Sequence, residues 1–303
     1  MTPRSGQRLR VSVVVPVFDQ WEHLAGCLQA LEQQTLGAES FEVLVVDNGS
    51  STPPPPAMPG QRLRLRWLQE SRPGSYAARN TGLRAAGADV LAFTDADCRP
   101  APRWLEEGLR ALDGPPQVDL VGGSITLFPA RPDRLSPVEA YELVKAFPQE
   151  RYVDQLRFAA TANLFARRAV FDSVGEFEER LRSGGDREFG QRAARAGHSW
   201  RYAPAAAVRH PARRTFGELG SKLARVVAGS RDARELAGSP LVTVDEVVRG
   251  LVPPLGAVRR ARADTRLPRP ADQAGYVLAE FYVRYVGTWL RLKSRVSGRS
   301  PRA

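Results

Sequence analysis

The sequence predicts an α/β fold with a mostly parallel sheet flanked by helices, followed by a helical C-terminal extension. Apolar, β-branched runs alternate with segments of helical periodicity over the first two thirds of the chain, which is typical of parallel strands joined by right-handed crossovers. Charge divides the chain: residues 1–210 hold 26 Lys and Arg against 25 Asp and Glu, and residues 211–303 hold 18 against 8. We therefore expect one domain at 1–210 and a basic helical extension at 211–303.

The first predicted elements are a strand, a helix and a second strand. Val11–Phe18 is an apolar, β-branched run bounded by turn signals, so it predicts a buried strand. Glu22–Gln34 carries its apolar residues at helical spacing. Phe41–Val46 predicts a second buried strand that ends in turn-forming residues. Residues 51–60 predict a loop, because the consecutive prolines at 53–56 exclude a helix.

The remaining elements are predicted from shorter patterns of the same kind. In order, they are a half-exposed strand at 63–68, a helix at 75–86, a buried strand at 89–94, a helix at 103–112, an extended segment at 118–128, a helix at 137–147, an apolar segment at 161–166, a helix at 186–196 and a strand at 200–208. Beyond His210 the pattern predicts only helices, at 216–228, 244–251 and 274–293.

The apolar segments are too short to predict a transmembrane helix, which needs roughly 18 or more apolar residues. Met1–Arg10 is polar and basic and is not followed by the apolar stretch of a secretory signal. The only cysteines are Cys27 and Cys98, and we expect both to be reduced. These observations predict a cytoplasmic location, either free or peripheral at the inner face of the plasma membrane.

A pair of carboxylates, Asp95 and Asp97, follows the predicted strand at 89–94. Ligands of parallel α/β sheets bind outside the carboxyl ends of the strands. Carboxylate oxygens suit Mg²⁺ or Mn²⁺, which commonly bind one or two carboxylates together with substrate phosphates. Aspartate is also common in turns, so a structural role stays open for this pair by itself.

Five segments, in order and at plausible spacing, resemble the family 2 glycosyltransferases of the GT-A fold, a Rossmann-like nucleotide-diphospho-sugar transferase fold. The resemblance covers roughly residues 11–210. The segments are Val11-Ser-Val-Val-Val-Pro-Val-Phe18, Leu44-Val-Val-Asp-Asn-Gly-Ser50, Gly74-Ser-Tyr-Ala-Ala-Arg-Asn-Thr-Gly82, Phe93-Thr-Asp-Ala-Asp97 and Gly184-Gly-Asp-Arg-Glu-Phe189.

The resemblance implies a donor site made of five residues. Asp47 would bond the nucleoside base in a pocket lined by Pro16 and Phe18. Arg79 would lie beside the nucleotide, and Asp95 would face the ribose and the outer shell of the metal. Each could instead be a local feature, since Asp47 stands in a turn and Arg79 on a helix.

The resemblance also implies a metal site and a catalytic base. Asp97 would coordinate Mn²⁺ or Mg²⁺ directly, and His210 stands where several family members place a metal-binding histidine. Asp186 would be the general base, with Glu188 in reserve, because Gly185 stands where Glu is frequent. The alternatives are a solvent-exposed loop position for His210, and ordinary acids of a first helical turn for Asp186 and Glu188.

The expected function is metal-dependent transfer of one hexosyl group from a nucleotide sugar, with UDP as the default, to a glycan or lipid-linked acceptor. Cell-envelope or polysaccharide glycan synthesis is the expected setting. One displacement with one base inverts the anomeric centre, by analogy with glycosidases. The chain lacks Gln-x-x-Arg-Trp, the acceptor-end signature of processive synthases, which favours transfer of a single sugar.

Two alternatives remain at this point. A sugar-nucleotide pyrophosphorylase-like enzyme should carry a glycine-rich loop after the first strand, where this chain has Pro16-Val17-Phe18-Asp19-Gln20. A nucleic-acid-binding protein could use the basic C-terminal third, although zinc-ligand spacing and RNA-recognition motifs are missing, so we expect no nucleic-acid partner.

The predicted helix at 274–293 has a wide apolar, aromatic face opposite a narrow stripe that contains Glu280, Arg284, Gly287 and Arg291. Three partners fit that face: the catalytic domain, a second subunit in a homodimer, or a membrane surface. Trp and Tyr suit the lipid headgroup region, and the excess of arginine suits anionic lipid.

Overall fold

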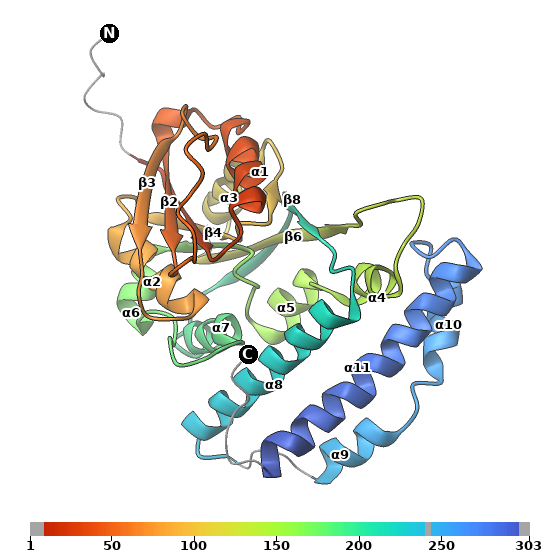
Figure 1. Cartoon of the computed structure of the whole chain (residues 1–303). Coiled ribbons are helices and arrows are strands. Elements are labelled where there is room, and N and C mark those ends of the chain that lie inside the picture. Colours follow the sequence, from red (N-terminus) through yellow and green to blue (C-terminus); the bar gives the residue numbers. More distant parts are fainter. Residues whose placement is uncertain (1–8, 240–243, 297–303) are drawn as a thin grey trace. The chain divides into compact units, whose positions relative to one another are not determined.

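The computed structural model describes residues 9–239 and 244–296 (Figure 1). Most of the basic segment Met1–Arg10 lies outside these ranges. The chain forms two compact units. Unit 1 comprises Met1–Thr126, Phe147–Glu179 and Gly185–His210, and unit 2 comprises Leu127–Ala146, Arg180–Gly184 and Pro211–Ala303. Two segments that precede residue 211 thus group with the C-terminal helices, and the charge pattern of the sequence does not mark them.

Within the described residues, eight strands form one sheet in the order β3-β2-β1-β4-β7-β6-β8-β5. β1, β2, β3 and β4 are parallel, with Val11 opposite Phe41 and Val17 opposite Asp47 in the central pair. The strands are β1 (Val11–Val17), β2 (Phe41–Asp47), β3 (Arg64–Gln69), β4 (Val90–Thr94), β5 (Arg99–Pro100), β6 (Leu120–Phe128), β7 (Asn163–Arg167) and β8 (Trp200–Pro211).

The second half of the sheet departs from the parallel arrangement. β7 is antiparallel to β4 and to β6, and β5 is antiparallel to β8. The α/β class is confirmed, and only β7 and β5 run against their neighbours, because the β6–β8 hydrogen bonds, from the Leu120 N–H to Ser199 and from the Ala212 N–H to Phe128, run in a parallel sense. Helical periodicity between strands predicts parallel crossovers, and the antiparallel pairs form between strands whose neighbours are set by the tertiary fold.

Helices cover both faces of the parallel strands. Alternate residues of β1, including Val13 and Val15, join the same core cluster as α1 (Trp21–Glu32) and α3 (Trp104–Asp113). On the other face, α2 (Ser75–Ala85) packs so closely that a Cβ on Gly82 would overlap Val14. Because both faces are covered, β1, β2 and β4 read as continuous apolar runs rather than alternating ones.

The other elements of unit 1 are short. They are the 3₁₀ turn η1 (Ala38–Ser40), α5 (Gln149–Leu156), α6 (Arg168–Val174) and α7 (Gly185–Arg195). The sequence pattern did not predict α5 and α6, which have eight and seven residues. The predicted helix at 186–196 is confirmed as α7.

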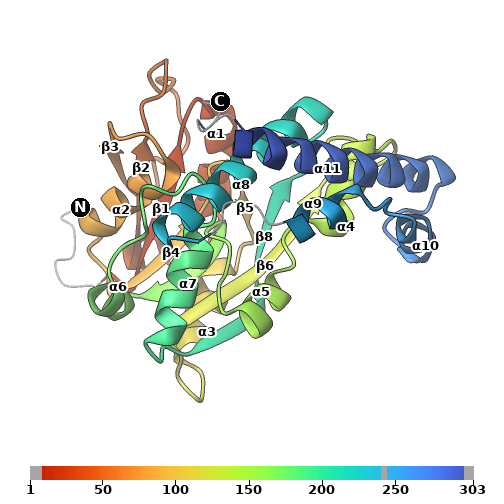
Figure 2. The same cartoon turned by 90° about the horizontal axis from the view of Figure 1, so that it is seen from below.

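Unit 2 consists of helices, with its own small core around Ala140, Ala257, Ala261, Leu267 and Tyr276. The long helix α11 contacts the other four (Figure 2). The helices are α4 (Pro137–Lys145), α8 (Phe216–Leu236), α9 (Val244–Leu251), α10 (Gly256–Ala263) and α11 (Pro270–Val296). The sequence did not predict α10, because its arginines hide the spacing of its two inward alanines.

Capping boxes begin two helices of unit 2. The Ser136 hydroxyl accepts a hydrogen bond from the Glu139 N–H while the Glu139 carboxylate accepts one from the Ser136 N–H, and Thr215 and Glu218 repeat the arrangement at α8. Each box satisfies two N–H groups that the helix itself leaves without a partner. α8 runs to Leu236, eight residues beyond the predicted end at 228.

Part of the wide apolar face predicted for the C-terminal helix is exposed. Leu278 and Trp289 are each 55% exposed, whereas Glu280 and Thr288 are 8% and 2% exposed. Gly287, placed on the polar stripe by the sequence, is buried. Small residues face the neighbouring helices because they allow close approach: a Cβ on Gly250 of α9 would overlap Thr288. Leu278 and Trp289 are thus not covered by the helices of unit 2, and the partner of this face stays a prediction.

Candidate active site

Asp97 and His210 are brought together by the antiparallel pairing of β5 with β8. Arg99 lies opposite Arg209 in that ladder, so the residues that precede β5 reach the end of β8. Asp97 Oδ2 and His210 Nε2 lie 3.4 Å apart, and the His210 ring is 4% exposed. The Phe147 ring packs on the imidazole with centroids 5.1 Å apart. His210 is thus a buried residue, not a solvent-exposed one.

The residues here fit a divalent cation. One carboxylate and one imidazole present oxygen and nitrogen ligands at neighbouring positions, a set compatible with Mn²⁺ and, through the oxygens, with Mg²⁺. Potential ligand atoms of Asp97, Cys98 and His210 all lie within 4.8 Å of one another. Burial raises the pKa of the Cys98 thiol well above its ordinary value, so Cys98 stays a protonated thiol and donates to the Ala162 carbonyl.

Asp95 has a different partner. Its Oδ1 lies 2.5 Å from Nη2 of Arg79, a guanidinium of α2 that is almost completely buried. Nη1 of Arg79 donates to the Ser75 carbonyl, and the group lies 5.6 Å from the centroid of the Tyr76 ring. Nε of Arg79 has no hydrogen-bond partner among the described residues. A buried cation with a remaining donor suits an anionic ligand such as a phosphate.

Asp186 stands at the start of α7, as the sequence predicts. The Tyr76 hydroxyl lies 3.4 Å from Asp186 Oδ1 and accepts from the Asp186 N–H at 3.3 Å. Burial raises the pKa of Asp186, against the lowering effects of the Arg187 N–H and the charge of Arg79. A raised pKa brings a carboxylate closer to the range useful for general-base catalysis. Glu188, the reserve candidate, pairs with Arg192 on the same helix.

The structure explains why glycine stands at position 185, where the family pattern frequently has Glu. A Cβ at this position would come within 2.7 Å of the Tyr76 ring. Glycine therefore lets the Tyr76 side chain lie against the start of α7 and reach Asp186. The chain of contacts Asp95–Arg79–Tyr76–Asp186 connects the end of β4 with the predicted base.

Pro16, Phe18 and Asp47 meet at the carboxyl ends of β1 and β2, where Val17 lies opposite Asp47. Phe18 is 59% exposed. Asp47 Oδ1 accepts a hydrogen bond from the Ser50 N–H at 2.9 Å, so Asp47 stabilises the turn that follows β2, as its position in the sequence allows. The second carboxylate oxygen leaves room for a further bond.

Two asparagines that the sequence analysis did not single out hold the loops of this site. Asn48 donates to the Glu70 and Arg72 carbonyls and accepts from the Gly74 N–H, which fixes the segment before α2. Asn80 donates to the Phe177 carbonyl and accepts from the Phe177 N–H. Both asparagines lie in segments that resemble the family motifs. The motifs therefore pointed to these segments but did not indicate that the two asparagines hold the loops.

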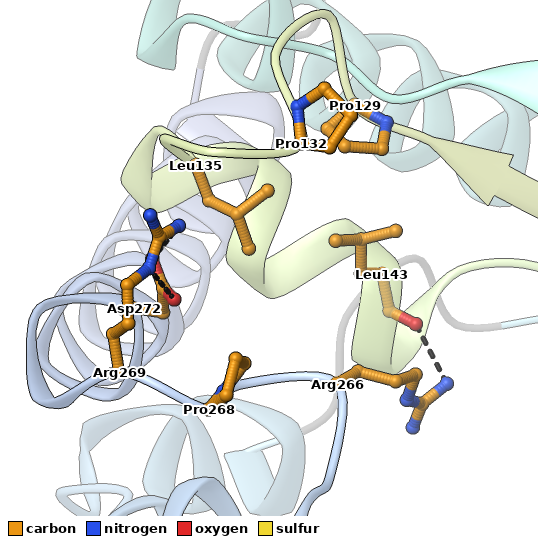
Figure 3. A pocket seen from close by; sticks show the side chains of 8 residues that line it. All are labelled: Pro129, Pro132, Leu135, Leu143, Arg266, Pro268, Arg269 and Asp272. Atoms are coloured by element: carbon orange, nitrogen blue, oxygen red, sulfur yellow. Dashed lines mark hydrogen bonds and ion pairs between the residues drawn. The ribbon is translucent and has the colours of Figure 1, made fainter.

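A pocket of about 360 Å³ lies in unit 2 (Figure 3). Its cations are already engaged: Arg269 pairs with Asp272, and Arg266 donates to the Leu143 carbonyl. The rest of its lining is apolar. None of the residues predicted for the donor, the metal or the base lines it.

Comparisons with known proteins identify the family of the chain. The family model described as glycosyl transferase family 2 matches residues 12–175. The chain is 38% identical over 230 residues to the glycosyltransferase AglE of Haloferax volcanii, covering 72% of each protein. It is 31% identical to the pre-mycofactocin glycosyltransferase of Mycobacterium tuberculosis, covering 69% of this chain and 44% of that protein.

Solved structures share the fold. The mannosyltransferase PcManGT from Pyrobaculum calidifontis, in complex with GDP-Man and Mn²⁺, matches with a TM-score of 0.55 at 19% identity over 97% of this chain and 77% of that one. S. aureus TarS 1-349 in complex with UDP matches with a TM-score of 0.51 at 16% identity, over 97% and 93%. The chain therefore belongs to glycosyltransferase family 2, and it is a transferase with the GT-A fold.

Proposed function

We propose that this glycosyltransferase moves one sugar from a nucleoside-diphosphate sugar to an acceptor hydroxyl with inversion, using a divalent cation held by Asp97 and His210. The observation that carries the proposal is the pairing of Asp97 with a buried His210, at the carboxyl edge that also holds Asp95. Family membership removes the pyrophosphorylase-like and nucleic-acid-binding alternatives as the main function.

The donor would lie along the ends of β1, β2 and β4. Asp47 would accept a hydrogen bond from the base, with Pro16 and Phe18 forming the wall of the base pocket. Asp95 would face the ribose, held in place by Arg79. Asp97 and His210 would hold Mn²⁺ or Mg²⁺, whose positive charge would stabilise the leaving diphosphate, and the Arg79 guanidinium would add to that charge.

Asp186 would act on the acceptor. As the acceptor oxygen forms its bond to the anomeric carbon, its proton passes to the Asp186 carboxylate and the bond to the diphosphate breaks. The Tyr76 hydroxyl holds that carboxylate in position through its contact with Oδ1. One displacement inverts the anomeric configuration, so an α-linked donor gives a β-linked product.

The proposal also names the nucleoside base of the donor and the class of acceptor. We propose a UDP-sugar donor, supported by the UDP complex of TarS, while the GDP-Man complex of PcManGT makes GDP the first competitor to test. The proposed acceptor is a glycan or lipid-linked saccharide of cell-envelope or polysaccharide synthesis. A lipid-linked acceptor is consistent with the surface of unit 2 described below.

A thermal-shift panel of UDP, GDP, dTDP and CDP, each with and without Mn²⁺, tests the donor and metal together. A ligand that binds only the native state at a hundred times its Kd stabilises the protein by about 2.7 kcal/mol. We expect a shift with UDP that needs Mn²⁺ and disappears in Asp97→Ala. Asp172→Ala, an exposed aspartate of α6, is the matched control and should keep the shift. A full UDP shift in EDTA, with transfer intact, would contradict the metal assignment.

A further inference from the structure

The large apolar side chains that remain exposed are concentrated in unit 2. Among the described residues, eleven of the thirteen exposed large apolar side chains belong to unit 2, and only Phe18 and Trp67 belong to unit 1. An apolar surface of this kind marks a contact site more often than chance. Two groups stand out: Leu278, Tyr285, Trp289 and Leu292 on α11, and Val248, Leu251, Val252, Leu255 and Val258 on α9, α10 and the connection between them.

The two groups are neighbours around α11. Arg284 of α11 donates to the Arg249 and Val252 carbonyls at the end of α9, and Thr288 packs against Gly250. Tyr282, on the opposite flank, packs against Phe216 of α8. Residues 278, 285, 289 and 292 fall between these two flanks on a helix of 3.6 residues per turn. The exposed stripe of α11 thus runs beside α9, and together they form what we call the apolar–basic face.

The packing of the helices in unit 2 leaves the apolar–basic face exposed to solvent. In α10, Ala257 and Ala261 point into the core of unit 2, which turns Val258, Arg259 and Arg262 toward solvent. Leu255, just before α10, is 75% exposed. Each exposed apolar residue therefore lies on an element whose other side is packed or hydrogen bonded, so the exposure is a property of the fold.

The charge of the face has one sign. Between Glu246 and Asp264 the chain contains no Asp or Glu, and Arg249, Arg259, Arg260 and Arg262 are exposed. Next to Trp289, Lys293 is also exposed, and its ammonium lies 5.0 Å from the Trp289 ring centroid. The exposed charges of this face are thus positive, which selects an anionic partner.

We propose that the apolar–basic face docks on a membrane that contains anionic lipid. Aliphatic and aromatic side chains enter the headgroup region, while arginine and lysine reach the lipid phosphates on their long apolar stems. A symmetric dimer through the same face would set these cations against their own copies. A nucleic acid would use the arginines but would leave Leu255, Leu251 and Trp289 without a role.

Vesicle flotation of the full-length protein tests the proposal. The vesicles are phosphatidylcholine alone, or phosphatidylcholine with about 30% phosphatidylglycerol, at low and high salt. We expect binding to the anionic vesicles at low salt, at least about tenfold above neutral vesicles. Leu255→Ser with Trp289→Ser should lower the partition by about tenfold or more. Arg259→Gln with Arg262→Gln should lower it by about thirtyfold.

The control is Trp67→Ser, which removes an exposed tryptophan of unit 1 and should bind like the wild type. Asp186→Asn should also bind normally, so failure of docking and failure of the proposed transfer reaction can be told apart. Absence of the wild type from anionic vesicles at low salt would overturn the proposal. So would binding that depends on the arginines alone and is lost to competing RNA, or a dimer in sedimentation that dissociates in the Leu255 and Trp289 variant.

Discussion

Unit 1 and unit 2 distribute charged and apolar side chains in opposite ways. In unit 1 the apolar side chains are almost all inside, and the charged groups of Asp95, Arg79 and Asp186 gather where strands end and helices begin. In unit 2 the carboxylate of Glu142 is buried, and eleven of the thirteen exposed large apolar side chains of the described residues lie in this unit. In the first unit these polar groups form the proposed donor and base sites, whereas in the second Glu142 joins two helices through ion pairs.

The buried carboxylate of Glu142 joins helices of unit 2 through ion pairs. Glu142 of α4 accepts from Arg213 at 2.9 Å and from Lys222 of α8 at 2.7 Å. Burial would raise the pKa of Glu142, but the charges of Lys222 and Arg213 outweigh it, and the pKa is lowered. Burial lowers the pKa of Lys222, so the pair is held together at a desolvation cost. Changing a single carboxylate should therefore lower the activity when the residue lies in unit 1 and the stability when it lies in unit 2.

The largest effect is expected in unit 1, from Asp186→Asn. Asparagine keeps the shape but cannot accept the proton, so kcat should fall roughly 10²–10⁴-fold. Donor affinity, measured by UDP titration, should change little. Glu188→Gln is the matched control, because Glu188 is engaged with Arg192 and should be dispensable for proton transfer. A nearly active Asp186→Asn beside an inactive Glu188→Gln would assign the base to Glu188.

The second effect belongs to unit 2. Glu142→Gln leaves two cations without their buried carboxylate, which should cost about 3 kcal/mol of unfolding free energy, or roughly 10²-fold in the folding equilibrium. Urea unfolding measures this, with Glu235→Gln as control, since that carboxylate is 49% exposed and should contribute little. If the free energy of unfolding of Glu142→Gln equals that of the wild type, the buried ion pairs do not stabilise unit 2 and the proposed difference between the units is wrong.

The same carboxylate gives unit 2 a pH dependence. The folded-state pKa of Glu142 is lowered, so its contribution is present above the unfolded pKa and is lost as the pH falls through the folded value. Stability of the wild type should therefore fall in acid more steeply than that of Glu142→Gln. Parallel curves for the two proteins would mean that Glu142 keeps an ordinary pKa.

A smaller effect is expected from Tyr76→Phe. The change keeps the ring against Gly185 and Arg79 but removes the hydroxyl that faces Asp186. We expect about a tenfold loss in kcat with an unchanged KM for the donor. The hydrogen bond lowers the pKa of Asp186, so its removal should move the acidic limb of the pH–rate profile to higher pH. Tyr202→Phe is the control, and an unmoved limb would deny Tyr76 a role in positioning the base.

The smallest effect concerns the stability cost of the base itself. Burial raises the pKa of Asp186 in the folded state. Its contribution to stability is therefore present below the unfolded pKa and is lost as the pH rises through the folded pKa. At neutral pH the carboxylate is the disfavoured form, so Asp186→Asn should melt slightly higher than the wild type. A lower melting temperature would show that the carboxylate is stabilised by its surroundings.

The sequence by itself determined most of the parallel half of the sheet and the residues at its edge. β1, β2 and β4 are continuous apolar runs, and such runs are visible without any knowledge of their neighbours. Asp47, Asp95 and Asp97 follow those runs directly, so their position at the carboxyl edge also follows from local sequence. The order of the five family-like segments then identified the family.

Only the tertiary structure decided which distant residues meet. The contact of Asp97 with His210 depends on the pairing of β5 with β8, and that of Tyr76 with Asp186 on the absence of a side chain at Gly185. Neither is encoded in a local period. The orientation of α11 is the clearest case, because small residues allow close packing and place Trp289 outside. Hydrophobic periodicity reports which residues share a helix face, and the shapes of the neighbouring helices decide which face is covered.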